Sequence, residues 1–325
     1  MFSRKATGYR KIVIHCGLHK TGSSYLQQLF LANRNELKRK SVYYPEFRNP
    51  DAAAMHKGNH SIVAVSYDKN RSAEENLSSF FDLNSDCDTL LISGEEFSRV
   101  NDVSGFLSGL KQFAPDADIR LVFYLRRYDH MIESVYSETV KYSLTGDISR
   151  AEYQLDYGAI LAPFIDAVGL KQITVRPYNR ALWYDEDLAT DFFASSGLHG
   201  VRKTLRLIPR TNEALSRQET FMLSLIRTTR AKQLMTALLA RTPLSSYESP
   251  GRYFRSASDR RRFNAAFAGS GQKLADKCGL GDIGLFLDLW NFDDDPTWAP
   301  FDPDWLAIAG HLTKLGEELA DALSK

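Results

Sequence analysis

The 325-residue sequence predicts an α/β fold, a doubly wound parallel sheet followed by a helical C-terminal third. Short apolar runs alternate with amphipathic helical stretches through the first two thirds of the chain. These runs are apolar throughout rather than alternating, as strands buried on both faces of a sheet require. After about Pro209 only the helical period remains. We therefore expect a core over residues 1–208 and a helical extension packed on it over residues 209–325.

The expected elements alternate between strand and helix along the chain. Apolar runs predict strands at 12–16, 42–44, 89–93, 119–125 and 172–175. Helical periodicity predicts helices at 23–38, 72–82, 102–113, 128–142, 157–168, 185–195, 213–241, 256–278 and 303–323. Residues 46–70 have no clear period and are rich in Asn, His and Ala, so we interpret them as a loop or lid.

The composition narrows the classes of function. The chain has 41 Lys plus Arg and 40 Asp plus Glu, a net charge of +1, whereas a dedicated nucleic-acid binder carries a basic excess. An anionic ligand must therefore be held by a local cluster. The three cysteines, Cys16, Cys87 and Cys278, are far apart and lack the spacing of metal ligands. With no signal peptide and no apolar stretch of about 20 residues, we expect a cytoplasmic protein without a metal or a membrane span.

A glycine-bearing loop between the first strand and the first helix is the most informative segment. Residues 15–25 read His-Cys-Gly-Leu-His-Lys-Thr-Gly-Ser-Ser-Tyr, at the place where a doubly wound sheet binds phosphates. Gly17 and Gly22 have the spacing of a nucleoside-triphosphate loop, but Ser23 follows Gly22 and the lysine lies earlier, at Lys20. This order suits an anionic donor that needs no metal. The bland alternative is an ordinary strand-to-helix turn with Lys20 in solvent.

The run Gly-x-x-Lys-Thr-Gly-Ser-Ser-Tyr-Leu-Gln resembles the 5′-phosphosulfate loop of sulfotransferases that use 3′-phosphoadenosine-5′-phosphosulfate (PAPS), particularly the bacterial carbohydrate-type branch. The resemblance implies that Lys20 contacts the 5′-phosphate and stabilises the leaving group. It also implies phosphate binding by Thr21, Gly22, Ser23 and Ser24. Gly17 joins these donor-binding candidates because glycine lets backbone N–H groups turn inward, and His19 because its place within the loop suits a donor-binding or positioning role. Cytosolic members usually carry Trp where this chain has Tyr25. The resemblance extends over about residues 12–198.

A second anion site is expected after the fourth strand, where Arg126 precedes a helix. Ser134 lies eight residues beyond Arg126, and this spacing resembles the family's 3′-phosphate motif. The resemblance implies that Arg126 forms charge-assisted contacts with the 3′-phosphate and that Ser134 adds a hydroxyl. A solvated polar helix face is the alternative for Ser134.

Transfer to a hydroxyl needs a base, and the third strand ends in Gly94-Glu95-Glu96 at the expected ligand edge. Family members place a histidine or glutamate near this strand end, and the Ser-x-Glu pattern favours Glu95 over Glu96. The alternative is that the pair caps the next turn or is solvated. Four further side chains are base candidates: His19, His56, His60 and Glu46. Sulfotransferases close over the nucleotide with a basic C-terminal loop, which the Arg252–Arg262 cluster could supply. Its spacing does not match the Arg-Lys-Gly triplet of cytosolic members, and this favours a solvated helix face.

The sequence therefore predicts a PAPS-dependent sulfotransferase acting on an acceptor hydroxyl, of a carbohydrate by resemblance, and releasing 3′-phosphoadenosine-5′-phosphate. Catalytic roles fall to Lys20 and Glu95. Two alternatives stay open at this point: a P-loop kinase or NTPase, which would need Mg²⁺ and a lysine directly after Gly22, and a non-catalytic nucleotide-binding homologue. Neither the acceptor nor the oligomeric state follows from the residues.

Overall fold

The computed structural model describes residues 8–83, 85–143, 156–208, 215–241, 251–254, 256–277, 299–300 and 305–323. The chain forms two compact units. The first comprises Met1–Arg126, Asp156–Asn212 and Ser270–Leu289, and the second comprises Arg127–Leu155, Glu213–Gly269 and Trp290–Lys325. The boundary expected between residues 208 and 209 adjoins residues 209–214, outside the described part, and stays a prediction.

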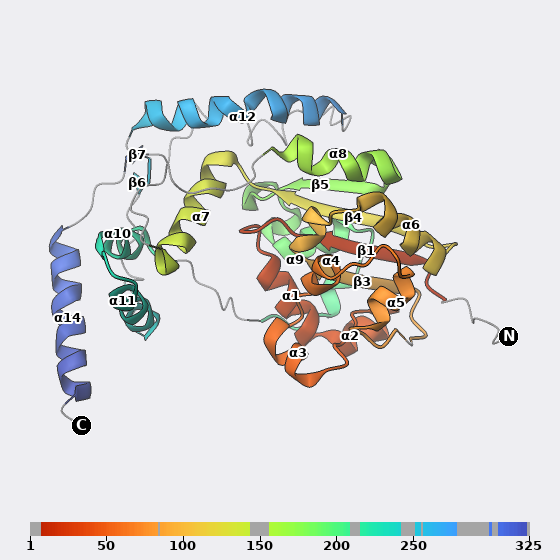
Figure 1. Ribbon diagram of the computed structural model, residues 1–325, viewed down its shortest axis with the longest axis horizontal. Helices are drawn as coiled ribbons and strands as arrows, with labels where there is room; N and C mark the ends of the chain where they lie inside the picture. The colour runs from red at the N-terminus through yellow and green to blue at the C-terminus, as the bar shows by residue number, and fades with distance from the viewer. Residues whose placement is uncertain are drawn as a thin grey trace. The chain divides into compact units, whose positions relative to one another are not determined.

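The first unit is built on a five-stranded sheet in the order β2-β3-β1-β4-β5, and every pairing in it is parallel (Figure 1). The strands are β1 (Lys11–Cys16), β2 (Val42–Tyr43), β3 (Thr89–Gly94), β4 (Asp118–Leu125) and β5 (Ile173–Pro177). The chain starts near the middle of the sheet and moves first to one edge and then to the other. The predicted α/β class with a parallel sheet is confirmed, and the carboxyl ends of β1, β3 and β4 meet at one edge.

Helices cover both faces of this sheet (Figure 1). Those of the first unit are α1 (Ser23–Ala32), α2 (Arg34–Arg39), α3 (Pro50–His56), α4 (Ser61–Val65), α5 (Ala73–Ser78), α6 (Val103–Phe113), α8 (Tyr157–Val168) and α9 (Leu188–Ser195). Between them lie 3-10 turns at Glu96–Arg99, Leu170–Gln172, Arg180–Leu182, Tyr184–Glu186 and Arg202–Thr204. Among the described residues, no helix combines the length and the apolar character needed to cross a bilayer.

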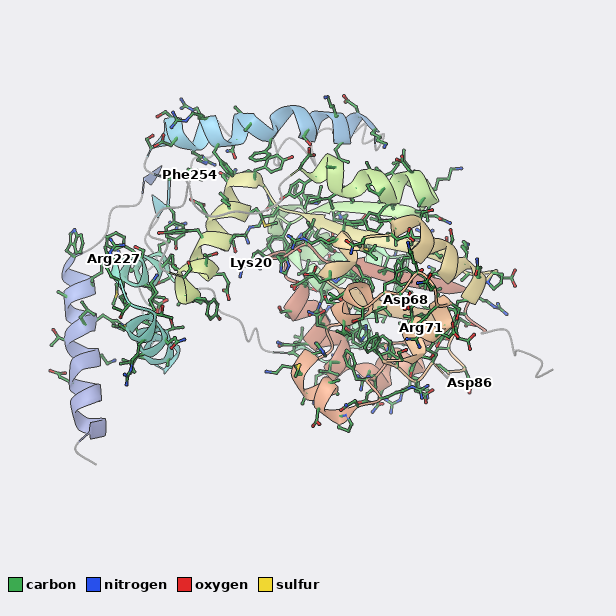
Figure 2. The ribbon with its side chains drawn as sticks, viewed as in Figure 1. Lys20, Asp68, Arg71, Asp86, Arg227 and Phe254 are labelled. Carbon is green, nitrogen blue, oxygen red and sulfur yellow. The ribbon has the colours of Figure 1, made fainter. Side chains whose placement is uncertain are left out.

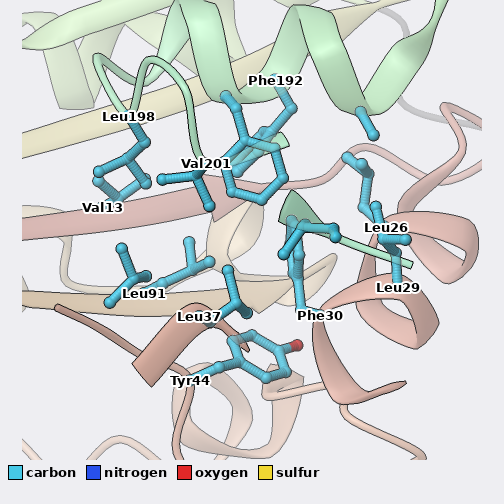
Figure 3. Packing of buried hydrophobic residues seen from close by; sticks show 14 of the residues in the cluster. Val13, Leu26, Leu29, Phe30, Leu37, Tyr44, Leu91, Phe192, Leu198 and Val201 are labelled. Atoms are coloured by element: carbon cyan, nitrogen blue, oxygen red, sulfur yellow. The ribbon is translucent and has the colours of Figure 1, made fainter. Parts of the chain in front are cut away.

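One face of the sheet packs against α1 and α9 to form the main core (Figure 3). Val13 of β1 and Leu91 of β3 lie opposite each other and meet Phe30 and Phe192 from the two helices. On the other face, Phe123 of β4 packs edge-on against a ring of α8, 5.2 Å between centroids. Strands covered in this way need apolar side chains on both faces, which is why the strand runs show no alternation.

The single helix expected over residues 23–38 is divided into α1 and α2 at Asn33. The buried Asn33 side chain donates to the carbonyl of Leu29 and to the carbonyl of Arg206, both at 2.9 Å, and accepts the Arg206 N–H at 2.7 Å. These bonds hold Asn33 out of helical geometry, with φ −112°. The partner is 173 residues away, so local periodicity does not reveal the break.

The loop or lid expected over residues 46–70 is wrong, because α3 and α4 lie there. Asn49 caps α3 by accepting the N–H groups of Asp51 and Ala52, and Pro50 occupies the first turn. The Asn-Pro pair is a signal for the start of a helix. Periodicity did not reveal the helix, because none of the α3 residues is buried and the segment has no apolar stripe.

The second unit contains α7 (Tyr128–Tyr142), α10 (Arg217–Leu225), α11 (Thr229–Arg241), α14 (Trp305–Leu323) and two short paired strands, β6 (Gly251–Arg252) and β7 (Ala299–Pro300). Helix α12 (Ala257–Lys277) contributes residues to both units. The helix expected over 213–241 is interrupted, because Ile226 is extended and the Thr228 hydroxyl caps α11 by accepting the Ala231 N–H. Residues 213–214 lie outside the described part.

The basic cluster on α12 is only partly a solvated face. Arg262 is exposed and pairs with Asp259, but Arg260 is buried and donates to Asp129 at 2.5 Å. Arg127 also contacts this carboxylate, at 2.7 Å. Burial alone would raise the pKa of Asp129, but the charges of His130, Arg127 and Arg260 prevail and lower the pKa to about 2. Arg255 lies outside the described residues.

Two histidines are buried on either side of Ser93 at the end of β3. His15 Nδ1 and the Ser93 hydroxyl share a 2.8 Å hydrogen bond, and His60 Nδ1 accepts the Ser93 N–H at 3.3 Å. Neither Nε2 atom has a hydrogen-bond partner among the described residues. Burial lowers the pKa of both rings to about 3. His60 is therefore a neutral residue of the core, and this geometry does not support a role for it as the base.

We expect the two buried histidines to make the protein acid-sensitive well above the range of carboxylate titration. Unfolding returns each ring to water, where its pKa is about 6.5, so the unfolded state takes up protons first. The contribution of the two histidines to the free energy of unfolding is complete above pH 6.5. At pH 5 this free energy is lower by about 2 kcal/mol for each ring. Urea unfolding from pH 8 to pH 5 measures it, and His15→Asn and His60→Asn, which keep a group at the Nδ1 position, should flatten the slope. An equal pH dependence in wild type and in both variants would contradict the assignment.

Candidate functional site

The loop between β1 and α1 has an unusual backbone. Lys20 (φ 64°) and Gly22 (φ 77°) are both left-handed, and Thr21 between them has the ordinary negative φ. Such an alternation is the geometry in which successive backbone N–H groups converge on one point. A lysine in the left-handed region is strained, and strain of this kind gathers at functional loops. Lys20 lies at the carboxyl edge of the sheet (Figure 2).

Two features of position 22 favour glycine. Its φ is left-handed, and a Cβ atom at this position would lie 2.5 Å from the Leu188 side chain and 3.1 Å from the Tyr178 ring. Gly22 is also the N-cap of α1 and brings no side chain that could cover the first turn of the helix. The N-terminus of α1 thus opens toward the loop, as an anion-binding turn needs.

The hydroxyl groups of the loop have different partners. The Thr21 hydroxyl is buried and donates to the Leu18 carbonyl at 2.6 Å, so it shapes the loop from within. The Ser23 hydroxyl is buried as well and donates to the Glu95 carboxylate. Ser24 is half-buried at the start of α1. Of the three predicted hydroxyl donors, Ser24 is the one whose side chain is partly exposed.

The structure brings the two predicted anion sites together. The Arg126 guanidinium donates from Nη1 to the Lys20 carbonyl at 2.9 Å, and it lies over the Tyr178 ring at 5.5 Å. The backbone of Arg126 is fixed in turn by the Tyr157 hydroxyl, which donates to its carbonyl at 2.6 Å. Arg126 follows β4 and Lys20 follows β1, neighbours in the sheet, so their meeting is a consequence of the strand order.

Tyr178 is a site residue that the sequence analysis missed. It follows β5 directly, its N–H donates to the Leu125 carbonyl at 2.6 Å, and its ring contacts Trp183 at 5.1 Å. The signal was available, because Tyr178 stands at a strand end just as Arg126 does. The proposed partner Ser134 lies half-buried on α7, in the second unit, and its pairing with Arg126 stays a prediction.

Glu95 sits beside the loop at the end of β3. Its Oε1 accepts the Ser23 hydroxyl, and its Oε2 lies 3.3 Å from His19 Nδ1. Its side chain is 18% exposed. The structure therefore places three predicted site residues in one connected group, and the group belongs to the same edge as Lys20.

Ser61 fixes both glutamates, and the sequence analysis did not identify it. Its hydroxyl accepts the backbone N–H of Glu95 at 2.8 Å and that of Glu96 at 3.2 Å. The approach is possible because β3 ends in glycine: a Cβ on Gly94 would lie 2.7 Å from the Ser61 nitrogen. No motif in the sequence links position 61 to position 95.

Two other base candidates, His56 and Glu46, contact residues outside this group. His56 stacks on Phe47 with centroids 5.2 Å apart, and Glu46 pairs with Arg34 at 2.7 Å. Within the described residues, no group of three His, Cys, Asp or Glu side chains is arranged to hold a metal ion. The site consists of backbone amides, two cations and a carboxylate network, which together can bind an anionic group and accept a proton.

We expect Gly22→Ala to unfold more easily than a matched variant, Gly200→Ala. Both glycines are left-handed, with φ 77° and 80°, but a Cβ on Gly200 meets nothing within 4 Å. Both variants should lose about 1 kcal/mol to backbone strain, and Gly22→Ala a further 1–3 kcal/mol, roughly, to the collision with Leu188. Urea unfolding of the two variants measures the difference, and equal midpoints would refute the packing argument.

Comparison with known proteins finds similarity among solved structures. No protein-family model and no curated protein sequence matches the chain. Among solved structures, the chain is similar to a sulfotransferase from Alicyclobacillus acidocaldarius, with 16% sequence identity and a TM-score of 0.33 over 73% of this chain and 98% of that one.

Proposed function

We propose that the chain is a sulfotransferase that moves a sulfuryl group from PAPS to an acceptor hydroxyl. The observation that carries the proposal is the hydrogen bond from the Arg126 guanidinium to the Lys20 carbonyl. It links Arg126 to Lys20, 106 positions apart in sequence, and these are the residues around which the two anion sites are proposed. The donor carries phosphate at two ends of one nucleotide, and it needs two cationic sites on one sheet edge.

The donor would be held mainly by the loop. The backbone of Thr21 and Gly22, the hydroxyl of Ser24 and the ammonium of Lys20 would face the 5′-phosphosulfate. The Gly17 N–H donates to the Gly94 carbonyl at 3.1 Å, so Gly17 would support the loop. Arg126 would hold the 3′-phosphate, with Ser134 as its proposed helper. Because Thr21 and Ser23 donate within the protein, they would support the loop more than they contact the donor.

The reaction would be a direct in-line displacement. The acceptor oxygen forms a bond to sulfur while the bond from sulfur to the 5′-phosphate oxygen breaks, and the electron pair leaves with that phosphate. Lys20 stabilises the charge that develops there, and Glu95 takes the proton of the acceptor hydroxyl. The products are a sulfate ester, 3′-phosphoadenosine-5′-phosphate and a proton.

The carbohydrate acceptor rests on the sequence resemblance. A small-molecule alcohol or a tyrosine would use the same chemistry, because each presents a hydroxyl to the same base. An acceptor panel must therefore include sugars, simple alcohols and a tyrosine peptide.

We expect 3′-phosphoadenosine-5′-phosphate to raise the melting temperature without Mg²⁺, since ligand binding stabilises the folded state. Arg126→Lys should weaken binding by about tenfold or more, because it loses a bidentate donor and the contact to the Lys20 carbonyl. Lys20→Met should weaken it similarly. Differential scanning fluorimetry over a nucleotide series gives both values.

Arg180→Lys and Lys203→Met serve as matched controls, because both side chains are exposed and Arg180 pairs only loosely with Glu186, at 3.6 Å. Stabilisation by Mg·ATP with no response to 3′-phosphoadenosine-5′-phosphate would overturn the donor assignment in favour of a P-loop phosphotransferase.

We expect Glu95→Gln to lower the rate of transfer by about 100-fold or more while nucleotide binding is retained, since a general base contributes at least that much. Transfer of ³⁵S from labelled PAPS to the acceptor panel measures the rate. A Glu95→Gln enzyme as fast as wild type would remove Glu95 as the base, and a wild type that binds the nucleotide but labels no acceptor would point to a non-catalytic homologue.

A further inference from the structure

The imidazole ring of His19 lies between the carboxylate of the candidate base, Glu95, and the carboxylate of Glu96. His19 Nδ1 lies 3.3 Å from Glu95 Oε2, and His19 Nε2 lies 3.3 Å from Glu96 Oε1. The two glutamates are neighbours in sequence, and their N–H groups share the Ser61 hydroxyl. The far oxygen of Glu95 holds the Ser23 hydroxyl. Each end of the ring therefore faces an acceptor of hydrogen bonds.

The two neutral forms of the ring would act oppositely on Glu95. With the proton on Nδ1, the ring donates to Glu95, stabilises its charge and makes it a poorer base. With the proton on Nε2, the ring donates to Glu96, and the lone pair of Nδ1 faces Glu95. The lone pair of Nδ1 and the carboxylate oxygen of Glu95 then repel each other. The repulsion ends when Glu95 gains a proton and forms a hydrogen bond to Nδ1 with it. The second form thus drives Glu95 to accept a proton.

Two features favour the Nε2–H form. Glu95 already receives the Ser23 hydroxyl, whereas the Glu96 side chain, 31% exposed, is free to turn its oxygen toward Nε2. The Nε2–H form is also the intrinsically preferred tautomer of neutral histidine.

We propose that His19 is a positioning residue that turns Glu95 into an effective base and passes its proton on to Glu96. The inference rests on the proposed function and adds a path for the proton. The acceptor hydroxyl gives its proton to Glu95. Glu95 then delivers a proton to Nδ1 as the Nε2 proton moves to Glu96, whose side chain reaches solvent and releases it. Glu95 is thereby returned to its charged form. The ring is left with its proton on Nδ1, and since the His19 side chain is 35% exposed, proton exchange with solvent returns the ring to the Nε2–H form before the next turnover.

The arrangement explains why the loop carries a histidine directly before its lysine. One segment then supplies both the cation for the leaving group and the ring that tunes the base. Forming and breaking bonds on the acceptor and donor sides would be coordinated by two adjacent residues. Glu96, which the sequence analysis ranked below Glu95, acquires a role that does not require contact with the acceptor.

The tautomer of His19 can be read without any activity. In full-length protein labelled with ¹⁵N-histidine, we expect His19 near pH 7.5 to show a protonated Nε2 and an unprotonated Nδ1. The spectrum of His19→Asn assigns the signal, and His199→Asn, at an exposed position, is the matched control. Glu96→Ala should move the proton toward Nδ1, because the acceptor at Nε2 is gone. Glu74→Ala, an exposed carboxylate on α5, should leave the spectrum unchanged.

Transfer kinetics give the second readout. Glu96→Ala should lower kcat by about fivefold and move the acid limb of the pH–rate profile to lower pH, because a ring that donates to Glu95 weakens it as a base. Nucleotide binding by Glu96→Ala should match that of wild type. His19→Asn should lower kcat by about tenfold or more and lose the dependence on Glu96, so that adding Glu96→Ala to it has no further effect.

The outcomes separate the two claims. If wild type transfers the label but His19 carries its proton on Nδ1, or if Glu96→Ala keeps the wild-type pH profile, the relay is overturned and the proposed function stands. If wild type labels no acceptor, the proposed function fails and the relay fails with it. A shifted tautomer together with a shifted acid limb supports both.

Discussion

The geometry of the site depends on one hydrogen bond, from the Arg126 guanidinium to the Lys20 carbonyl. Lys20, whose carbonyl accepts from this guanidinium, has the left-handed φ of 64°. Gly22 continues the turn at a place where only hydrogen fits between Leu188 and Tyr178. The shape of the loop is therefore supported by contacts to its neighbours within the first unit.

The sheet supplies the second constraint. Parallel strands carry their carboxyl ends to one edge, so residues from β1, β3 and β4 gather there although they are up to 106 positions apart. The segments at this edge pack so closely that two positions favour glycine. A Cβ atom on Gly22 would collide with Leu188 of α9, and one on Gly94 would collide with the Ser61 backbone. Close packing and the chemistry of the site are thus parts of one arrangement, since the same contacts that fill space also fix Glu95 beside His19.

Much of this was predictable from the sequence, and the failures have a common cause. Strands β1, β3 and β4 and helix α8 were found because periodicity is a local signal, and Lys20, Glu95 and Arg126 were proposed because strand ends in a parallel sheet converge. The break at Asn33, the short helix α3 and the roles of Ser61 and Tyr178 were missed. Each depends on contacts across the fold or on capping without an apolar stripe. The links among His19, Glu95 and Glu96 are likewise spatial, since position 19 and position 95 share no spacing rule.

The clasp between Asn33 and Arg206 has a consequence for how the chain is made. One amide side chain satisfies both backbone groups of a residue that is synthesised 173 positions later. The contact between Asn33 and Arg206 can therefore form only after the far end of the first unit has been synthesised, whereas the bond from Asn33 to the Leu29 carbonyl is local and is available from the start.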